Sequence, residues 1–78
     1  MSAYVFHVGA GDGAARVVLH LSLESDVEAG VRSFDLLRAH PECEWAVVAC
    51  GGEVILRRTR DGGKLTLVWA AGRPRRLP

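Results

Sequence analysis

The stretch from Trp45 to Trp69 most strongly limits what this chain can fold into, because glycines divide it into three short apolar runs. The breaks fall at Gly51-Gly52 and at Asp61-Gly62-Gly63. Glycine adopts a positive φ without a Cβ clash, so such sequences suit the tight turns that join antiparallel strands. The spacing predicts a three-stranded meander with strands at Trp45–Cys50, Glu53–Thr59 and Lys64–Ala70.

The first turn also predicts a register. A two-residue turn at Gly51-Gly52 sets Ala49 opposite Val54 and Val47 opposite Leu56. The second turn centres on Asp61-Gly62 or on Gly62-Gly63, and both choices keep the same side chains on the same face. The expected helix-facing side of the meander is Trp45, Val47, Ala49, Val54, Leu56, Leu65, Leu67 and Trp69.

The N-terminal half predicts two strands and a helix. Ala3–Val8 and Arg16–Leu23 are rich in β-branched residues or alternate in polarity, which indicates a hairpin. Ser25 and Glu28 form a capping box for a helix that ends near Ala39 or His40, because Pro41 follows. The apolar positions of that helix that recur at helical spacing, and so should face the sheet, are Val27, Val31, Phe34 and Leu37, with Gly30 beside them.

These elements predict an α+β fold: a five-stranded antiparallel sheet with one helix packed on one face, in the order ββαβββ. Residues 1–71 form one domain, and residues 72–78 (GRPRRLP) form a basic, mobile tail. The expected core is Leu19, Leu21, Phe34, Leu56, Leu67 and Trp69.

Length and composition narrow the class of protein. Seventy-eight residues with 49% hydrophobic content suffice for one small core. No apolar run approaches the roughly 20 residues that cross a bilayer, and no signal peptide is evident. The two cysteines then suggest free thiols and a reducing, cytoplasmic location.

Charge is divided along the chain. Residues 1–53 contain eight acidic and three basic side chains, whereas residues 54–78 contain one acidic and seven basic ones. Such a division can steer partners of either sign, or it can simply keep the surface solvated.

Three candidate contact surfaces follow. The first is an acidic face of Asp26, Glu28, Asp35, Glu42 and Glu44; the second is an open sheet face of Val48, Ile55 and Val68; the third is a nucleic-acid-binding set of Arg57, Arg58, Arg60, Lys64, Arg73, Arg75 and Arg76.

Motifs for catalysis or cofactor binding are weak. Residues 9–14 fit the pattern G-x-G-x-x-A, but a period-two strand rather than a helix follows, which argues against a dinucleotide site. His40 and Cys43 lack the companions that structural zinc requires, and His7 and His20 share only an outer face. No catalytic signature surrounds Cys43 or Cys50. We therefore expect no enzyme activity, no cofactor and no metal.

In class, the chain resembles the small phage-encoded inhibitors called anti-CRISPR proteins. The resemblance covers the whole chain and concerns its single α/β unit, its lack of a catalytic constellation, its polarised charge and its Ala/Arg/Gly/Val-rich composition. It implies an inhibitor that acts in the cytoplasm of a bacterial host, binds a Cas surveillance complex and blocks recruitment of target DNA. It carries over no site residue.

Two functions stay open from the sequence. The first is a non-catalytic protein-binding module that acts as a monomer or weak homodimer, with a CRISPR effector complex as one partner. The alternative is a nucleic-acid-binding module that uses the arginine-rich C-terminal half. Because the five aromatic residues fall mostly on the expected core face, no base-stacking platform is evident.

Overall fold

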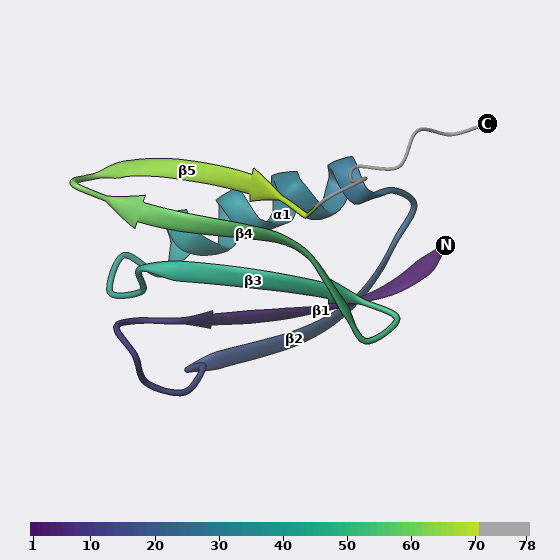
Figure 1. Cartoon of the computed structure of the whole chain (residues 1–78), viewed down its shortest axis with the longest axis horizontal. Helices are drawn as coiled ribbons and strands as arrows, with labels where there is room; N and C mark the ends of the chain where they lie inside the picture. The colour runs from purple at the N-terminus through teal and green to yellow at the C-terminus, as the bar shows by residue number, and fades with distance from the viewer. Residues whose placement is uncertain (71–78) are drawn as a thin grey trace.

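A computed structural model describes residues 1–70, which form one antiparallel sheet of five strands with one helix against it (Figure 1). The elements are β1 (Ser2–Gly9), β2 (Val17–Leu23), α1 (Asp26–Ala39), β3 (Trp45–Cys50), β4 (Glu53–Asp61) and β5 (Lys64–Trp69). The ββαβββ order and the fold class agree with the sequence prediction. The predicted tail, residues 72–78, lies outside the described residues, as do Arg73, Arg75 and Arg76.

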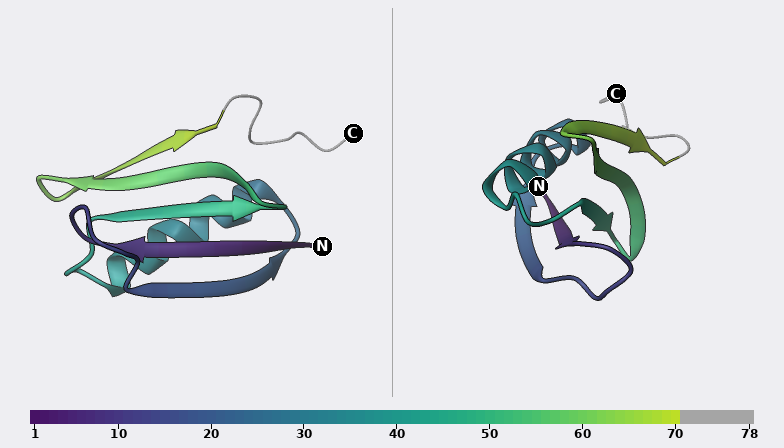
Figure 2. Two further views of the ribbon diagram at one scale, coloured as in Figure 1. Left: turned by 60° about the horizontal axis from the view of Figure 1, so that its bottom comes forward. Right: turned by 90° about the vertical axis from the view of Figure 1, so that its left-hand side faces the viewer.

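The strand order in the sheet is β2-β1-β3-β4-β5, and all four pairings are antiparallel (Figure 2). Helix α1 crosses from β2 to β3 and packs mainly over β1, β3 and β4. No other described element covers the opposite, open face of the sheet. The sheet therefore has one face under the helix and one that faces solvent.

Both glycine turns form as the sequence predicts. Gly51 and Gly52 have φ values of 62° and 79°, and Cys50 pairs with Glu53 across them. The second turn is Gly62-Gly63, because Asp61 pairs with Lys64. This settles the choice between its two possible centres.

A β-bulge at Ile55 reverses the predicted faces of β3. Ala49 pairs with Val54 as expected, but Val48, rather than Val47, then pairs with Leu56, so Ile55 is an extra residue on β4. A bulge of this kind sets two residues of one strand against one of its partner. Ala46 and Val48 consequently point under the helix, whereas Trp45, Val47 and Ala49 lie on the open face.

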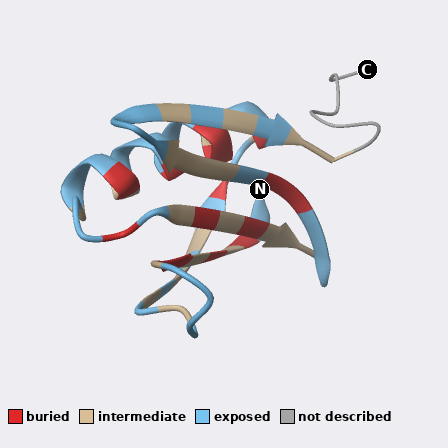
Figure 3. Ribbon diagram, turned by 60° about the vertical axis from the view of Figure 1, so that its left-hand side comes forward, coloured by how far each residue is buried: buried red, intermediate tan, exposed pale blue. Residues whose placement is uncertain are grey.

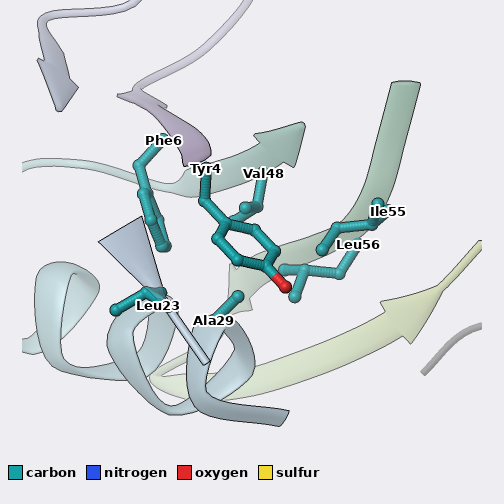
Figure 4. Close-up of a cluster of buried hydrophobic side chains, with 7 residues drawn as sticks. All are labelled: Tyr4, Phe6, Leu23, Ala29, Val48, Ile55 and Leu56. Carbon is teal, nitrogen blue, oxygen red and sulfur yellow. The ribbon is translucent and has the colours of Figure 1, made fainter. Parts of the chain in front are cut away.

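The bulge also corrects the predicted open sheet face. Val48 and Ile55 are both fully buried, and of that predicted surface only Val68 is exposed. Ile55 and Leu56 are consecutive yet both lie in the core, which regular alternation would forbid. Figure 4 shows both side chains with Tyr4, Val48 and Ala29 in the main buried cluster.

The helix buries a different stripe from the predicted one. Val27 and Val31 are 57% and 56% exposed and Phe34 is 37% exposed, while the buried positions are Asp26, Ala29, Gly30, Ser33 and Leu37. Small helix residues face the sheet because a large ring of the sheet already fills the space between the sheet and α1. A Cβ on Gly30, for example, would lie 3.3 Å from the indole of Trp69. Of the predicted helix stripe, only Leu37 and Gly30 face inward.

Burial is uneven along the covered face. Leu56 is 1% exposed, as predicted, whereas Leu19, Leu21, Leu67 and Trp69 are half-buried against the main cluster. Strand β5 contains no fully buried residue, and Figure 3 shows it in tan and pale blue only. The core is therefore centred on β1, β3 and β4, and β5 is a half-covered edge.

Candidate protein-interaction surfaces

The predicted acidic face does not form as one surface. Asp26 is only 6% exposed, and its carboxylate accepts a hydrogen bond of 2.8 Å from the hydroxyl of Tyr4. The Glu28 carboxylate accepts from the amide of Glu24, 3.1 Å away, at the start of α1. Glu44 accepts from the amide of Gly11 at 2.9 Å and so holds the β1–β2 loop. These three carboxylates have structural roles.

Asp35 and Glu42 are the two members of that face that remain exposed without a structural role. Glu42 lies 3.5 Å from the imidazole of His40. A hydrogen bond from its own backbone lowers the pKa of Glu42 below its ordinary value, and His40 and Arg16 lower it further. Glu42 is therefore a firmly charged site on the surface near the end of α1.

Alternation along β4 separates the predicted basic set. Arg58 and Arg60 lie on the helix side, whereas Arg57 points to the open face. Arg58 donates to the Ser33 hydroxyl at 2.9 Å and to the Gly30 carbonyl at 3.2 Å. Arg60 donates to the carbonyls of Cys43, at 3.1 Å, and Leu37.

The two helix-side arginines tie α1 to the sheet rather than forming a free basic patch. Arg58 also lies over the ring of Phe34, with 5.3 Å from its guanidinium carbon to the ring centroid, and Arg38 lies 5.7 Å from the same centroid. Partial burial lowers the pKa of Arg58, although a guanidinium stays protonated in proteins. Within the described part of the basic set, Arg57 and Lys64 remain exposed.

An apolar flank on α1, which consists of Val27, Val31 and Phe34, was not predicted from the sequence. These side chains are one turn apart along the helix and all are exposed. Gly30, their neighbour on the helix, faces Trp69 and Leu67, so the flank borders the half-buried side of β5. The helical spacing itself was evident in the sequence, but it was assigned to the core.

A second missed feature is a hollow of about 410 Å³ on the open face. Trp45 and Val47 from β3, Arg57 and Thr59 from β4, and residues 11–13 of the β1–β2 loop line it. Trp45 was expected under the helix and reaches the open face only because of the bulge. A bulge has no simple sequence signal, so this hollow could not be predicted.

The other predicted ligand types do not assemble into a site. Cys43 is buried, Cys50 is half-buried and both are free thiols. His7 and His20 lie on the open face as expected, but His7 pairs with Val18 and His20 with Val5. Among residues 1–70, no group of three or more His, Cys, Asp or Glu side chains could hold a metal ion.

Comparisons of the chain with known protein families, curated proteins and solved structures find no match. In the described range, no helix is long and apolar enough to cross a membrane.

Proposed function

We propose that this protein is a small, non-catalytic protein-binding module whose contact surface is the apolar flank of α1. The observation that carries the proposal is the row of Val27, Val31 and Phe34, which leaves three large apolar side chains exposed on one helix. Protein interfaces combine an apolar centre with a polar rim. Contiguous exposed apolar groups on a small domain are typical of such contacts.

The surroundings of the flank supply the rim. Asp35 follows Val31 by one turn and is exposed, and Arg38 lies against Phe34. The rim therefore carries both signs of charge, and Glu42 adds a further negative charge beyond the helix. A partner surface that fits has an apolar depression bordered by basic and acidic side chains.

The resemblance to anti-CRISPR proteins gives the proposal its most specific form. In that form the partner is a Cas surveillance complex, and binding blocks recruitment of target DNA. The exposed Asp35 and Glu42 support this form, because carboxylates can compete with phosphate for a positively charged channel. The burial of Asp26 and the structural bonds of Glu28 and Glu44 leave those two carboxylates as its charged contacts.

The test compares matched surface variants against one purified partner. The partner is first identified from the native host, and a purified Cas surveillance complex is measured in parallel. The double variant Val27→Ser/Val31→Ser should bind at least roughly tenfold more weakly than the unmodified protein, since apolar contacts at an interface centre dominate affinity. The control Val54→Ser/Val68→Ser changes two similarly exposed valines on the open face and should bind normally.

Charge-reversal variants test the contribution of the charged rim separately from that of the apolar centre. Asp35→Lys with Glu42→Lys should weaken binding and reduce its salt sensitivity if the partner surface is basic. Loss of binding in the open-face control, with the flank variant unaffected, would refute the flank as the contact surface. Unchanged binding of target DNA by the surveillance complex at saturating protein would refute the anti-CRISPR form alone.

A further inference from the structure

The hollow on the open face is separate from the apolar flank, because the sheet lies between them. Its floor is formed by β3 and β4, and one wall is the β1–β2 loop. Its volume of about 410 Å³ falls within the range of small-ligand sites. The hollow thus has room for a molecule with one ring system and a few substituents.

The aromatic wall of the hollow is fixed in place. The indole nitrogen of Trp45 donates to the carbonyl of Gly11 at 2.9 Å. The ring packs so closely on Gly9 that a Cβ there would lie 2.6 Å from it. The amide of Glu44 also donates to the Gly9 carbonyl at 2.8 Å. An indole held from two sides presents a preformed stacking surface, which lowers the entropic cost of binding a ring.

The charged and polar residues that line the hollow indicate what kind of ligand it could bind. Arg57 is exposed, its cross-strand neighbours are Val47 and Val68, and it forms no ion pair with any described residue. Thr59, on the same strand, lines the same hollow. Asp12, on the loop, is the acidic residue in its lining. A suitable ligand therefore has an anionic group for Arg57 and an N–H donor for Asp12.

We infer that the hollow binds an unpaired nucleotide, with the base stacked on Trp45 and the phosphate at Arg57. A nucleotide combines a planar ring, an anion and, in adenine, guanine and cytosine, an exocyclic amine that can donate to Asp12. Single-stranded nucleic acids are bound elsewhere by this pairing of aromatic stacking with positive charge. A base inside a duplex has no free face, so a duplex does not fit. This activity is additional to the proposed protein binding and does not depend on it.

The experiment uses the whole chain and follows the indole N–H signal of Trp45 by NMR, assigned with a Trp69→Phe variant. The probes are adenosine monophosphate, adenosine, ribose 5-phosphate and a single-stranded octamer of deoxyadenosine. Adenosine monophosphate should shift the Trp45 signal and saturate. Adenosine lacks the phosphate and ribose 5-phosphate lacks the base, so each should bind more weakly than adenosine monophosphate by roughly tenfold or more. Affinity for the octamer well above that for the monophosphate assigns the site to nucleic acid, and equal affinity assigns it to free nucleotides.

The variant Arg57→Gln should weaken binding of adenosine monophosphate by roughly tenfold or more, because a charge-assisted hydrogen bond is lost. The matched control is Arg32→Gln, which removes the same charge from an exposed position on α1. Equal affinities of these two variants would overturn the inference, as would the absence of any Trp45 shift with both the monophosphate and the octamer. Neither variant alters a core residue, so both should fold.

Discussion

The two faces of the sheet use the same residue types in opposite ways. On the covered face, Arg58 and Arg60 donate to carbonyls and a hydroxyl of the helix and its following loop, and they fasten α1 to the strands. On the open face, Arg57 lies between Val47 and Val68 and forms no such bonds with residues 1–70. Adjacent positions in a run of basic residues therefore have different roles, and the difference arises from the period of two in β4.

The same contrast holds for apolar side chains. Leu56 and Ile55 are buried between the sheet and α1, whereas Val54, Val18 and Val68 are 46%, 49% and 61% exposed on the open face. Stability should therefore depend on the covered face, and substitutions of the exposed side chains on the open face should change stability little. Matched substitutions across the sheet test this division.

The largest effect is expected at the centre of the covered face. Leu56→Ala should lower the free energy of unfolding by about 2–5 kcal/mol, because it leaves a cavity in a closely packed core. In a domain of this size that loss could remove most of the stability. The control Val54→Ala, two residues away on the same strand, should cost much less. Urea denaturation of both variants gives the two values, and equal losses would show that the faces of β4 are wrongly assigned.

The next largest loss of stability is expected at a buried polar contact. Tyr4→Phe removes the hydroxyl that donates to the buried carboxylate of Asp26, at a cost of about 1–3 kcal/mol. The aromatic ring stays, so the apolar packing of the core changes little. Circular dichroism against urea concentration measures the change. A stability equal to that of the unmodified protein would mean that Asp26 is as solvated as the other acids near α1, and the acidic face would regain a member.

The arginine pair on β4 compares the two faces directly. Arg58→Met keeps an unbranched side chain over Phe34 but removes the bonds to Ser33 and Gly30, and it should cost about 1–2 kcal/mol. Arg57→Met, one position earlier, should change stability by less than about 0.5 kcal/mol, as exposed substitutions usually do. Thermal unfolding of both variants measures the difference. A reversed order of the two effects would contradict the structural role given to Arg58.

A small effect on stability is also expected on the apolar flank. Val27→Ser/Val31→Ser should shift the free energy of unfolding by less than about 1 kcal/mol, because both side chains are more than half exposed. If the flank instead packed on the sheet, as its helical spacing first suggests, the double variant would unfold readily. Differential scanning calorimetry of this variant beside Leu56→Ala therefore also tests the orientation of α1.

Local sequence signals predicted the elements of the fold well. The turns at Gly51-Gly52 and Gly62-Gly63, the Ser25 cap and the stop before Pro41 each depend on nearby residues, and the structure contains all of them. The Ser25 hydroxyl, for example, accepts from the amide of Glu28 at 3.2 Å. Chemistry within a few residues is sufficient to set such features.

The faces were harder to predict, because they depend on partners distant in the sequence. The bulge at Ile55 is set by how β4 meets both β3 and β5, and the Ala70 amide bonds to the Ile55 carbonyl at 2.9 Å. The orientation of α1 depends on the Trp69 ring, which lies so close to Gly30 that a Cβ there would come within 3.3 Å of it. The hydrophobic spacing along the helix, taken alone, predicted instead that Val27 and Val31 face the sheet. Both candidate surfaces, the flank and the hollow, follow from these two long-range contacts.

The bulge has a consequence for how this protein can evolve. The spacing between the Gly51-Gly52 turn and Leu56 contains one residue more than a regular hairpin needs, and that residue, Ile55, is buried in the core beside Leu56. Loss of the Ile55 codon would keep Ala49 opposite Val54 and Val48 opposite Leu56, but it would remove a side chain that is fully buried in the core. Such a loss should be more damaging than most substitutions. Among natural variants of this chain, we therefore expect an apolar residue at the position of Ile55 and a constant distance from Gly52 to Leu56.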